Sequence, residues 1–327
     1  MKGKGDNFAL VSVIIPNYRH APYLRERIDS VLAQDYDAFE VIILDDCSPD
    51  DSRQIIESYR NHPRVSHIVL NEHNSGSTFA QWNKGFALAQ GEYIWIAESD
   101  DVAAPTLLST LVKGLQQHPE ASVAYCHSRL IDADGRVLSE QNARNPSPEG
   151  KVSVHRSQHF LRYLLLFNYI YNASMAVFRR KALQQVDDGY RRYRYCGDWH
   201  FWASICATGD VIEVHDMLNS FRQHKAKVTV DSRSDVARRW KDECEVISYI
   251  RSLCRLSAIG DHCFRGRLRK RLLRSGMNEE EMASLRLSFP QLCSGTAIDS
   301  IAYEIGKTLF GFLRHQQDIR FLRIRHF

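Results

Sequence analysis

The chain has 327 residues, 44% of them hydrophobic and 25% charged, with a formal net charge of +4 at pH 7. This length allows one large or two modest domains, and this composition excludes a disordered chain. No apolar run approaches the ~18 residues of a membrane-spanning helix, and the first six residues lack the apolar core of a signal peptide. We therefore expect a cytoplasmic protein.

The eight cysteines are spread along the chain without a Cys-x-x-Cys pair. Without a secretory signal, this spacing indicates reduced thiols and argues against a cysteine zinc site. Charge is uneven as well, because residues 232–327 hold 18 Lys and Arg against 11 Asp and Glu. Such a basic C-terminal part suggests an anionic partner.

Four apolar runs alternate with four helical patterns over the first 118 residues. We expect strands at residues 10–15, 39–44, 65–70 and 93–97. We expect helices at residues 22–34, 52–60, 77–90 and 105–117. Alternation at this spacing is typical of parallel strands with right-handed crossovers and helices on both faces. The predicted fold class is therefore α/β, with a Rossmann-like, mostly parallel sheet flanked by helices.

The regular alternation of strands and helices ends after His118. We expect strands at residues 121–126 and 173–178, helices at 157–167 and 198–207, a hairpin turn at 132–135, a loop at 140–152 and a hairpin-like segment at 213–222. Beyond residue 231 the pattern is helical and rich in arginine, with helices expected at 236–256 and 264–274. The sequence thus predicts a helical C-terminal extension.

Two of the predicted strands end in carboxylates. Asp45 and Asp46 follow the second strand, and Glu98, Asp100 and Asp101 follow the fourth. An ionised carboxylate is costly to bury alone, and ligands bind at the carboxyl ends of strands in open α/β sheets. The pattern favours a site for a divalent metal and a phosphate, with a surface turn before the helix at 105–117 as the alternative.

Two common nucleotide-binding motifs are missing. The first strand ends in Pro16-Asn17-Tyr18, not in Gly-x-Gly-x-x-Gly, which argues against a dinucleotide site. The phosphate-binding loop that ends in Gly-Lys-Ser/Thr is also absent. A nucleotide bound here would need a divalent cation to screen its phosphates.

An ordered set of motifs identifies a family. The set comprises Val11-Ser-Val-Ile-Ile-Pro-Asn-Tyr18, Asp45-Asp46, Asn74-Ser-Gly76, Asn83-Lys-Gly85, Gly91-Glu-Tyr-Ile94 and Glu98-Ser-Asp-Asp101. Together they resemble glycosyltransferase family two, of the GT-A fold, across roughly residues 9–225. Each motif is weak alone, and the ordered set is specific.

The resemblance implies roles for donor-binding residues. Pro16 and Tyr18 would line the nucleotide pocket, with Tyr18 beside the base. Asp46 would accept a hydrogen bond from the base, Asn83 would brace the donor and Asp100 would contact the ribose.

The resemblance also implies a metal, Mn²⁺ or Mg²⁺. Asp101 would be its ligand and Glu98 a supporting acid. Phe221-Arg222-Gln223-His224 resembles the family's aromatic-Arg-x-His ending, in which the histidine approaches the metal or the diphosphate. For His224, a surface imidazole after a strand is the alternative.

The family places its catalytic base before an aromatic-rich helix, most often as Glu-Asp-Trp. Here the segment reads Gly197-Asp198-Trp199, so Asp198 is the expected base and the preceding acid is missing. An N-cap role for Asp198 is compatible with catalysis. Four nearby aromatic residues could form a wall for the acceptor sugar or belong to the core: Tyr169, Tyr171, Trp199 and Trp202.

These features predict an inverting, non-processive glycosyltransferase that moves a sugar from a nucleotide-diphosphate sugar to a hydroxyl of a glycan or lipid-linked acceptor. The Gln-x-x-Arg-Trp motif of processive membrane synthases is absent, since Val236 stands where its glutamine would be. The alternatives are a sugar-nucleotide nucleotidyltransferase, which needs a Gly-rich basic loop after the first strand, and an inactive sugar-nucleotide-binding scaffold.

We expect a GT-A domain at residues 1–230, with a donor half at 9–118 and an acceptor half at 119–230, and a basic helical extension at 231–327. Apolar and arginine residues interleave over 309–327, which fits a membrane surface. The catalytic domain and a second subunit, as in a homodimer, are the other partners left open. We expect no nucleic acid, because the body lacks a basic groove.

Overall fold

The computed structural model describes residues 9–139, 150–224 and 235–313. It divides into two compact units. Unit 1 comprises Met1–Arg156, Ile170–Arg191 and Ser204–His224, and unit 2 comprises Ser157–Tyr169, Arg192–Ala203 and Lys225–Phe327. The division into donor half, acceptor half and extension concerns function and stays a prediction.

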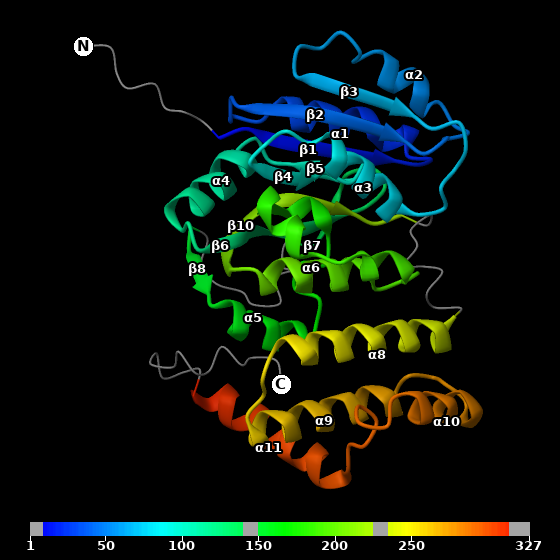
Figure 1. Cartoon of the computed structure of the whole chain (residues 1–327), viewed down its shortest axis with the longest axis vertical. Helices are drawn as coiled ribbons and strands as arrows, with labels where there is room; N and C mark the ends of the chain where they lie inside the picture. The colour runs from blue at the N-terminus through cyan, green and yellow to red at the C-terminus, as the bar shows by residue number, and fades with distance from the viewer. Residues whose placement is uncertain (1–8, 140–149, 225–234, 314–327) are drawn as a thin grey trace. The chain divides into compact units, whose positions relative to one another are not determined.

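Four parallel strands form the first part of the sheet in unit 1 (Figure 1). They are β1 (Val11–Asn17), β2 (Phe39–Asp45), β3 (Val65–Leu70) and β4 (Tyr93–Ile96), in the order β3-β2-β1-β4. All residues of β1, β2 and β4 are buried, which explains their continuous apolar sequences. Asn17 lies opposite Asp45 and Ile14 opposite Ile96, so the three strands end at one edge.

Three helices connect these strands, and a fourth follows β4 and β5 (Val102–Ala103). They are α1 (Ala21–Leu32), α2 (Ser52–Glu57), α3 (Thr78–Leu88) and α4 (Leu107–Gln117). Pro22 lies in the first turn of α1, where its fixed φ and missing N–H cost nothing. The predicted alternation of strands and helices, and with it the α/β fold class, is confirmed.

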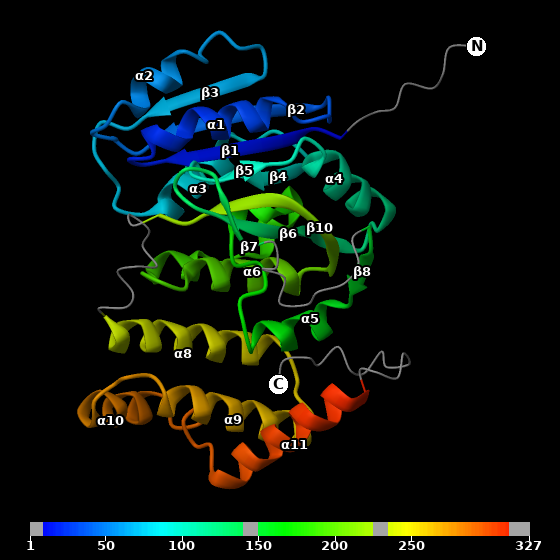
Figure 2. The same ribbon diagram turned by 180° about the vertical axis from the view of Figure 1, so that it is seen from behind.

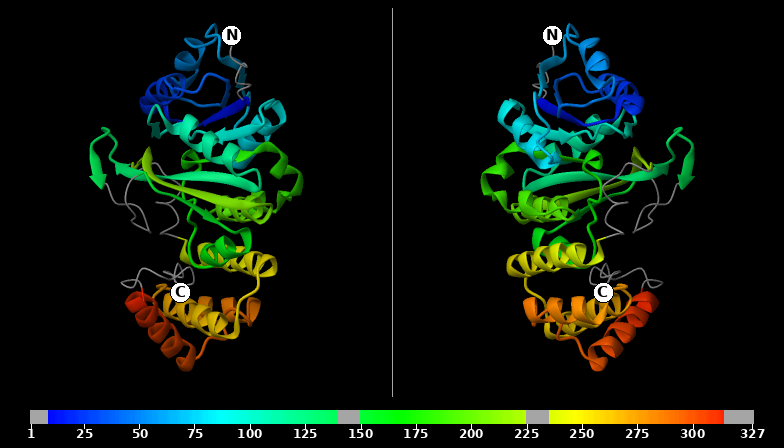
Figure 3. Two further views of the ribbon diagram at one scale, coloured as in Figure 1. Left: turned by 90° about the vertical axis from the view of Figure 1, so that its left-hand side faces the viewer. Right: turned by 90° about the vertical axis from the view of Figure 1, so that its right-hand side faces the viewer.

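The sheet continues past β4 with strands from the second half of unit 1. β9 (Ala176–Arg179) lies antiparallel between β4 and β6 (Ala121–Ile131). Next comes β10 (Asp210–Arg222), which pairs with β6, with β5 (Val102–Ala103) and with β8 (Val152–His155). β7 (Val137–Ser139) pairs with β6 as the predicted hairpin, and Figure 3 shows this hairpin standing out from the sheet.

Three expectations for this half were wrong in detail. Residues 213–222 are not a hairpin but part of the continuous strand β10, which gains partners on both sides from distant segments. Val152, assigned to a loop, begins β8, while residues 140–149 lie outside the described part of the chain. The strand expected at 173–178 begins with a 3₁₀ turn, Ala173–Met175, and only then becomes β9.

Unit 2 is helical, as Figure 2 shows. It contains α5 (Ser157–Leu164), the first part of α6 (Gly197–Ala207), α8 (Val236–Leu253), α9 (Ala258–Leu273), α10 (Glu279–Ser288) and α11 (Ala297–Leu313). The helices expected at 236–256 and 264–274 correspond to α8 and α9, with shifted ends. The sequence analysis did not find α10 and α11.

The axes of α9 and α11 come close at Gly266. A Cβ atom at this position would overlap the backbone carbonyl of Asp299 on α11, so only glycine allows this packing. No helix of residues 9–139, 150–224 and 235–313 has the length and apolar character that would let it span a bilayer. Of the basic segment at 309–327, residues 314–327 lie outside the described part of the chain.

Candidate active site

The carboxyl ends of β1 and β2 are joined by a buried polar contact. The Asn17 amide donates to Asp45 Oδ1 at 2.8 Å and to Ser48 Oγ at 3.2 Å. Two non-glycine residues next to it, Arg19 and Cys47, have positive φ values of 60° and 59°. Such conformations cost energy for ordinary residues and concentrate at functional sites. The loops after both strands are therefore held in defined, strained shapes.

Asp46 lies inside a cage of hydrogen-bond donors. Its carboxylate accepts from the Asn71 amide at 2.7 Å, the Gln81 amide at 2.8 Å, and the Ser75 hydroxyl and N–H at 2.7 and 2.9 Å. The Asn74 amide donates to the Asp46 carbonyl at 3.0 Å. Asp46 thus fixes the loop that follows β3. A hydrogen bond from a nucleotide base would have to replace one of these donors.

Asp101 has no exposed surface. One carboxylate oxygen accepts from the Asn172 amide and the Ser174 hydroxyl, both at 2.7 Å, and the other accepts from the Arg222 N–H at 3.0 Å. Arg27 lies 3.9 Å from the same carboxylate. The lone pairs of the Asp101 carboxylate are therefore directed at protein donors. The assignment of Asp101 as a metal ligand stays a prediction that this environment does not favour.

Two buried arginines lie around Asp101, of which the sequence analysis missed Arg27 and named Arg222 only as part of a motif. Arg27 on α1 donates to the Glu98 carbonyl at 2.8 Å and to the Ser174 hydroxyl at 3.0 Å. Arg222 on β10 donates to the Asp100 carbonyl at 2.8 Å and pairs with Glu26 at 2.5 Å. Both guanidinium groups therefore hold the backbone of the acidic turn in place. A helical arginine in an apolar pattern gives no local signal for this role.

Asp100 faces two histidines, and we call His20, Asp100 and His224 the edge cluster. His224 Nε2 lies 2.9 Å from Asp100 Oδ2, and the rings of His20 and His224 meet edge-on at 5.3 Å. Each residue offers one ligand atom, and the three atoms lie within 4.8 Å of one another. His20 is partly exposed, whereas the side chain of His224 is only 5% exposed. Two imidazoles and a carboxylate at the rim of a strand end fit a divalent metal. The sequence analysis missed His20.

Glu98, the first acid of the cluster, accepts a hydrogen bond from the Trp82 indole at 3.1 Å. Burial, with Asp100 and Asp101 nearby, raises the pKa of Glu98 to about 8. Glu98 is therefore largely protonated at neutral pH, which limits the negative charge that gathers at this turn.

The other predicted donor residues differ in accessibility. Pro16 is buried within β1 opposite Leu44, while Tyr18 is 42% exposed just beyond the strand. Asn83 is half-buried on α3, and its amide oxygen accepts from the Tyr190 hydroxyl. Of these three, only Tyr18 presents a large free surface at the strand end.

Asp198, the predicted base, belongs to unit 2 and lies in the first turn of α6. Its carboxylate accepts from the Asn168 amide at 2.9 Å. Burial raises the pKa of Asp198 to about 6. A carboxylate with this pKa is mostly ionised at pH 7 and is a stronger base than an ordinary aspartate, as proton abstraction requires.

The aromatic residues predicted as a sugar wall divide into two groups. Tyr169, Trp199 and Trp202 are buried in unit 2, and the Trp199 indole donates to the Leu164 carbonyl at 3.0 Å. Tyr171, in unit 1, is partly exposed and contacts the ring of Phe221 at 5.9 Å. The burial of the first group favours the core, the second of the two readings that the sequence left open.

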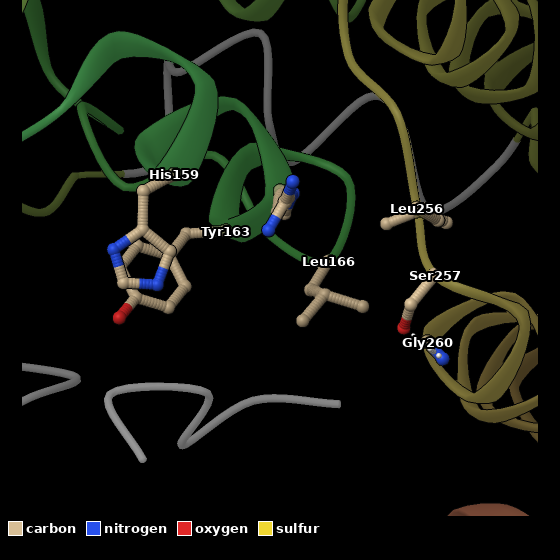
Figure 4. Close-up of a pocket in the computed structure, with 7 residues that line it drawn as sticks. His159, Tyr163, Leu166, Leu256, Ser257 and Gly260 are labelled. Atoms are coloured by element: carbon tan, nitrogen blue, oxygen red, sulfur yellow. Dashed lines mark hydrogen bonds between the residues drawn. The ribbon is translucent and has the colours of Figure 1, made fainter. Parts of the chain in front are cut away.

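A cavity in unit 2 is too small for a sugar nucleotide. It has a volume of about 50 Å³ and lies between α5 and the start of α9, where Tyr163, Leu166 and Ser257 line it (Figure 4). Pockets for ligands of that size usually measure about 300–1,000 Å³. None of the predicted site residues lines it, so it carries no argument about the donor.

Comparison with known proteins decides the family. A family model described as "Glycosyl transferase family 2" matches residues 12–187, more than half of the chain. The chain belongs to this family. The matched range contains the strand-end acids at Asp46 and Asp100, while Asp198 and His224 lie beyond it.

One curated relative of this family-2 chain is TuaG of Bacillus subtilis (strain 168), whose name assigns it to teichuronic acid biosynthesis. It is 42% identical over 133 residues, which are 40% of this chain and 51% of TuaG. In each of the first three curated relatives, the matched part is less than two thirds of the whole length.

Solved structures share the fold of this family-2 chain. Residues 1–349 of S. aureus TarS in complex with UDP-GlcNAc give a TM-score of 0.64 at 19% identity, over 95% of this chain and 93% of that chain. The mannosyltransferase PcManGT of Pyrobaculum calidifontis, in complex with GDP-Man and Mn²⁺, gives 0.51 at 18% identity, over 94% and 76%. The predicted GT-A fold is thereby confirmed.

Proposed function

We propose that this family-2 chain transfers a sugar from a nucleotide-diphosphate sugar to a hydroxyl of a glycan or lipid-linked acceptor, with inversion at the anomeric carbon. The observation that carries the proposal is the edge cluster at the carboxyl end of β4, in a chain of this family. Its two histidines and one carboxylate lie where α/β sheets bind ligands.

The metal is proposed to bind at the edge cluster. Asp100 and His224 would be its protein ligands, with His20 as a third, because their ligand atoms already converge. This choice gives Asp100 the role that the sequence suggested for Asp101, whose oxygens already accept three hydrogen bonds from protein donors. When bound, Mn²⁺ or Mg²⁺ would neutralise the charge that develops on the departing diphosphate.

The nucleotide is proposed to lie over the loops after β1 and β2. Tyr18 offers an exposed ring for stacking on the base, and Asp46 holds the neighbouring loop through its four accepted hydrogen bonds. Asn83, tied to Tyr190, would support the donor from α3. Mn²⁺ and GDP-Man in PcManGT, and UDP-GlcNAc in TarS, support a nucleotide-sugar donor for a chain of this fold.

Asp198 is proposed as the base. It would take the proton of the acceptor hydroxyl while that oxygen forms a bond to the anomeric carbon and the bond to the diphosphate oxygen breaks. The products are the glycosylated acceptor, the nucleoside diphosphate and a proton on Asp198. The pKa of about 6, raised by burial, suits this task at neutral pH.

The acceptor is proposed to be a growing cell-surface polysaccharide or its lipid-linked precursor. Support comes from TuaG, whose name places it in teichuronic acid biosynthesis. A peripheral position at the inner face of a membrane, reached through the basic residues of 309–327, and a homodimer are the accompanying proposals for its partners.

Two measurements test the function. Calorimetry with UDP, dTDP and GDP, each with and without Mn²⁺, is expected to show metal-dependent binding of at least one. Incubation with a panel of sugar nucleotides is then expected to release the nucleoside diphosphate from one of them. A chain that binds none of the three nucleotides, with or without metal, would contradict the donor site.

A further inference from the structure

Three strands of unit 1 bring three histidines around one glutamate, away from the residues of the candidate active site. The histidine–glutamate cluster consists of His127 on β6, His155 on β8, and Glu213 and His215 on β10. All four residues are at least nine-tenths buried. The family resemblance gives none of them a role.

The donor atoms of the cluster already converge. His127 Nε2 lies 3.0 Å from Glu213 Oε1, and His155 Nε2 lies 2.7 Å from Glu213 Oε2. Ligand atoms of His127, Glu213 and His215 lie within 4.8 Å of one another. Zinc bonds of about 2.0–2.2 Å in a tetrahedral site place ligand atoms about 3.4 Å apart. Small side-chain movements would therefore suffice to bind an ion.

An irregularity in β10 coincides with the cluster. Glu213 pairs with Tyr125 on β6, and the next matched pair is Met217 with His127. β10 therefore uses four residues where β6 uses two, and His215 lies among the extra ones. Bulges of this kind redirect side chains and are frequent next to functional sites. The His215 N–H donates to the Lys151 carbonyl at 3.0 Å, which fixes the irregular segment.

The charged groups around Glu213 also favour a bound metal ion. Among the described residues, the ion pairs of Glu213 are with His127 and His155, and none involves lysine or arginine. Two neutral imidazoles would satisfy both carboxylate oxygens, yet a third imidazole, His215, packs edge-on against His127 at 5.1 Å. His215 Nε2 lies 3.0 Å from Ser153 Oγ, so this ring contacts β8 and not Glu213 through that nitrogen. A metal ion would add a use for the third imidazole beside the carboxylate.

We propose that the histidine–glutamate cluster binds one divalent transition-metal ion, with His127, Glu213 and His215 as its ligands. His155 would hold the second carboxylate oxygen, as outer hydrogen-bond partners of metal ligands do. Two imidazoles and a carboxylate suit zinc, which is the probe used below. Because the ligands are buried, the ion would tie β6 to β10, and His155 on β8 would join through the carboxylate, without taking part in catalysis.

The experiment measures tightly held zinc. The full chain, without a histidine tag, is produced with Asp100→Asn and His224→Gln so that the edge cluster cannot hold metal. After growth with zinc and removal of free ions, elemental analysis is expected to find about one zinc per chain. Adding His215→Gln is expected to remove it, whereas His118→Gln, a histidine outside both clusters, is expected to leave it.

A second readout covers the case in which His215→Gln does not fold. The protein carrying only the two edge-cluster substitutions is stripped with a chelator and titrated with Co²⁺, and an intense visible absorption with an endpoint near one equivalent is expected. Absence of both zinc and the cobalt spectrum overturns the proposal. Full zinc occupancy in folded His215→Gln and Glu213→Gln proteins overturns it as well. Donor binding by the unsubstituted chain is measured separately, so neither proposal depends on the other.

Discussion

Two clusters in unit 1 combine a carboxylate with histidines, and their surroundings differ. In the edge cluster, Asp100 follows the end of β4 and lies beside His20 and His224, which themselves follow the ends of β1 and β10. In the histidine–glutamate cluster, Glu213 lies within β10 among three imidazoles that are at least nine-tenths buried. The same side-chain chemistry is therefore placed once at the rim of the sheet and once inside it.

The difference decides what each cluster can do. A metal at the rim keeps coordination positions for a substrate, whereas a metal held by buried ligands is enclosed by protein. Substitutions in the edge cluster should thus change activity with little effect on folding. Substitutions in the histidine–glutamate cluster should change the free energy of unfolding and leave the activity of the folded protein alone.

The largest expected effect is that of Asp100→Asn. Removing this charge would lose about 4 kcal/mol of metal-assisted stabilisation of the leaving group, a fall in kcat of about a thousandfold. We expect Mn²⁺-dependent nucleotide binding to weaken in calorimetry while Tm stays near that of the unsubstituted protein. Asp134→Asn, an exposed acid in the β6–β7 hairpin, serves as the control with normal activity.

The neighbouring acid makes this test decisive. Asp101→Asn should lower Tm, because the buried Asp101 carboxylate accepts from Asn172, Ser174 and Arg222. The opposite pattern would show that Asp101 is the metal ligand. In that case Asp101→Asn would abolish metal-dependent binding at unchanged Tm, and Asp100→Asn would have no effect.

A third carboxylate, Asp198 on α6, extends the comparison, because burial brings its pKa close to neutrality. Its pKa is raised to about 6 by burial, so the fraction able to accept a proton falls as the pH drops through 6. At saturating donor and metal, kcat should decrease close to tenfold per pH unit below that point.

Asp198→Asn should lower transfer by at least about a hundredfold and remove this acidic limb from the pH profile. Nucleotide binding, measured by calorimetry, should be retained. Transfer at the normal rate by the Asn variant would show that another group is the base.

A smaller effect, on stability, is expected for Glu213→Gln. Burial raises the pKa of Glu213, but hydrogen bonds from His127 and His155 outweigh it and hold the pKa well below its ordinary value. Ionised Glu213 therefore stabilises the folded state at pH values above the pKa that it has in the unfolded chain. This contribution is lost as the pH falls toward the lower pKa that it has in the folded protein. The glutamine would leave one imidazole donor poorly paired.

The cost of Glu213→Gln should be about 1–3 kcal/mol at pH 7, measured by urea denaturation. Transfer per folded molecule should be unchanged. A loss of transfer at full stability would place this cluster in the reaction and remove the distinction between the two clusters.

Much of unit 1 follows from local sequence. The first four strands are continuous apolar runs, and each is followed by a helical pattern, which leaves little choice but a parallel sheet. The acids at Asp46 and Asp100 stand next to their strands, so their common edge could be predicted from order alone. The separate environments of Asp100 and Asp101 could not, because they depend on partners more than 70 residues away.

Pairing between strands far apart in the chain explains why the sequence analysis misjudged β10 and did not find the histidine–glutamate cluster. β10 was mistaken for a hairpin because its partners, β6 and β8, come from distant segments. The histidine–glutamate cluster is invisible in the sequence for the same reason, since its members are separated by up to 88 positions in the chain. Only the sheet register brings Glu213 beside His127 and His155.

The smallest expected effect concerns Tyr18, which shares the strand edge with Asp46 and is 42% exposed. Tyr18→Ala should weaken nucleotide binding by about 1 kcal/mol, close to fivefold, because a half-exposed ring contributes near the lower end of base–aromatic stacking. Tyr18→Phe keeps the ring and should bind normally. Tm should not change for either variant, since little packing is lost. Equal affinities for the Ala and Phe variants would mean that the base lies elsewhere, and the rim of the sheet would then hold the metal without holding the nucleoside.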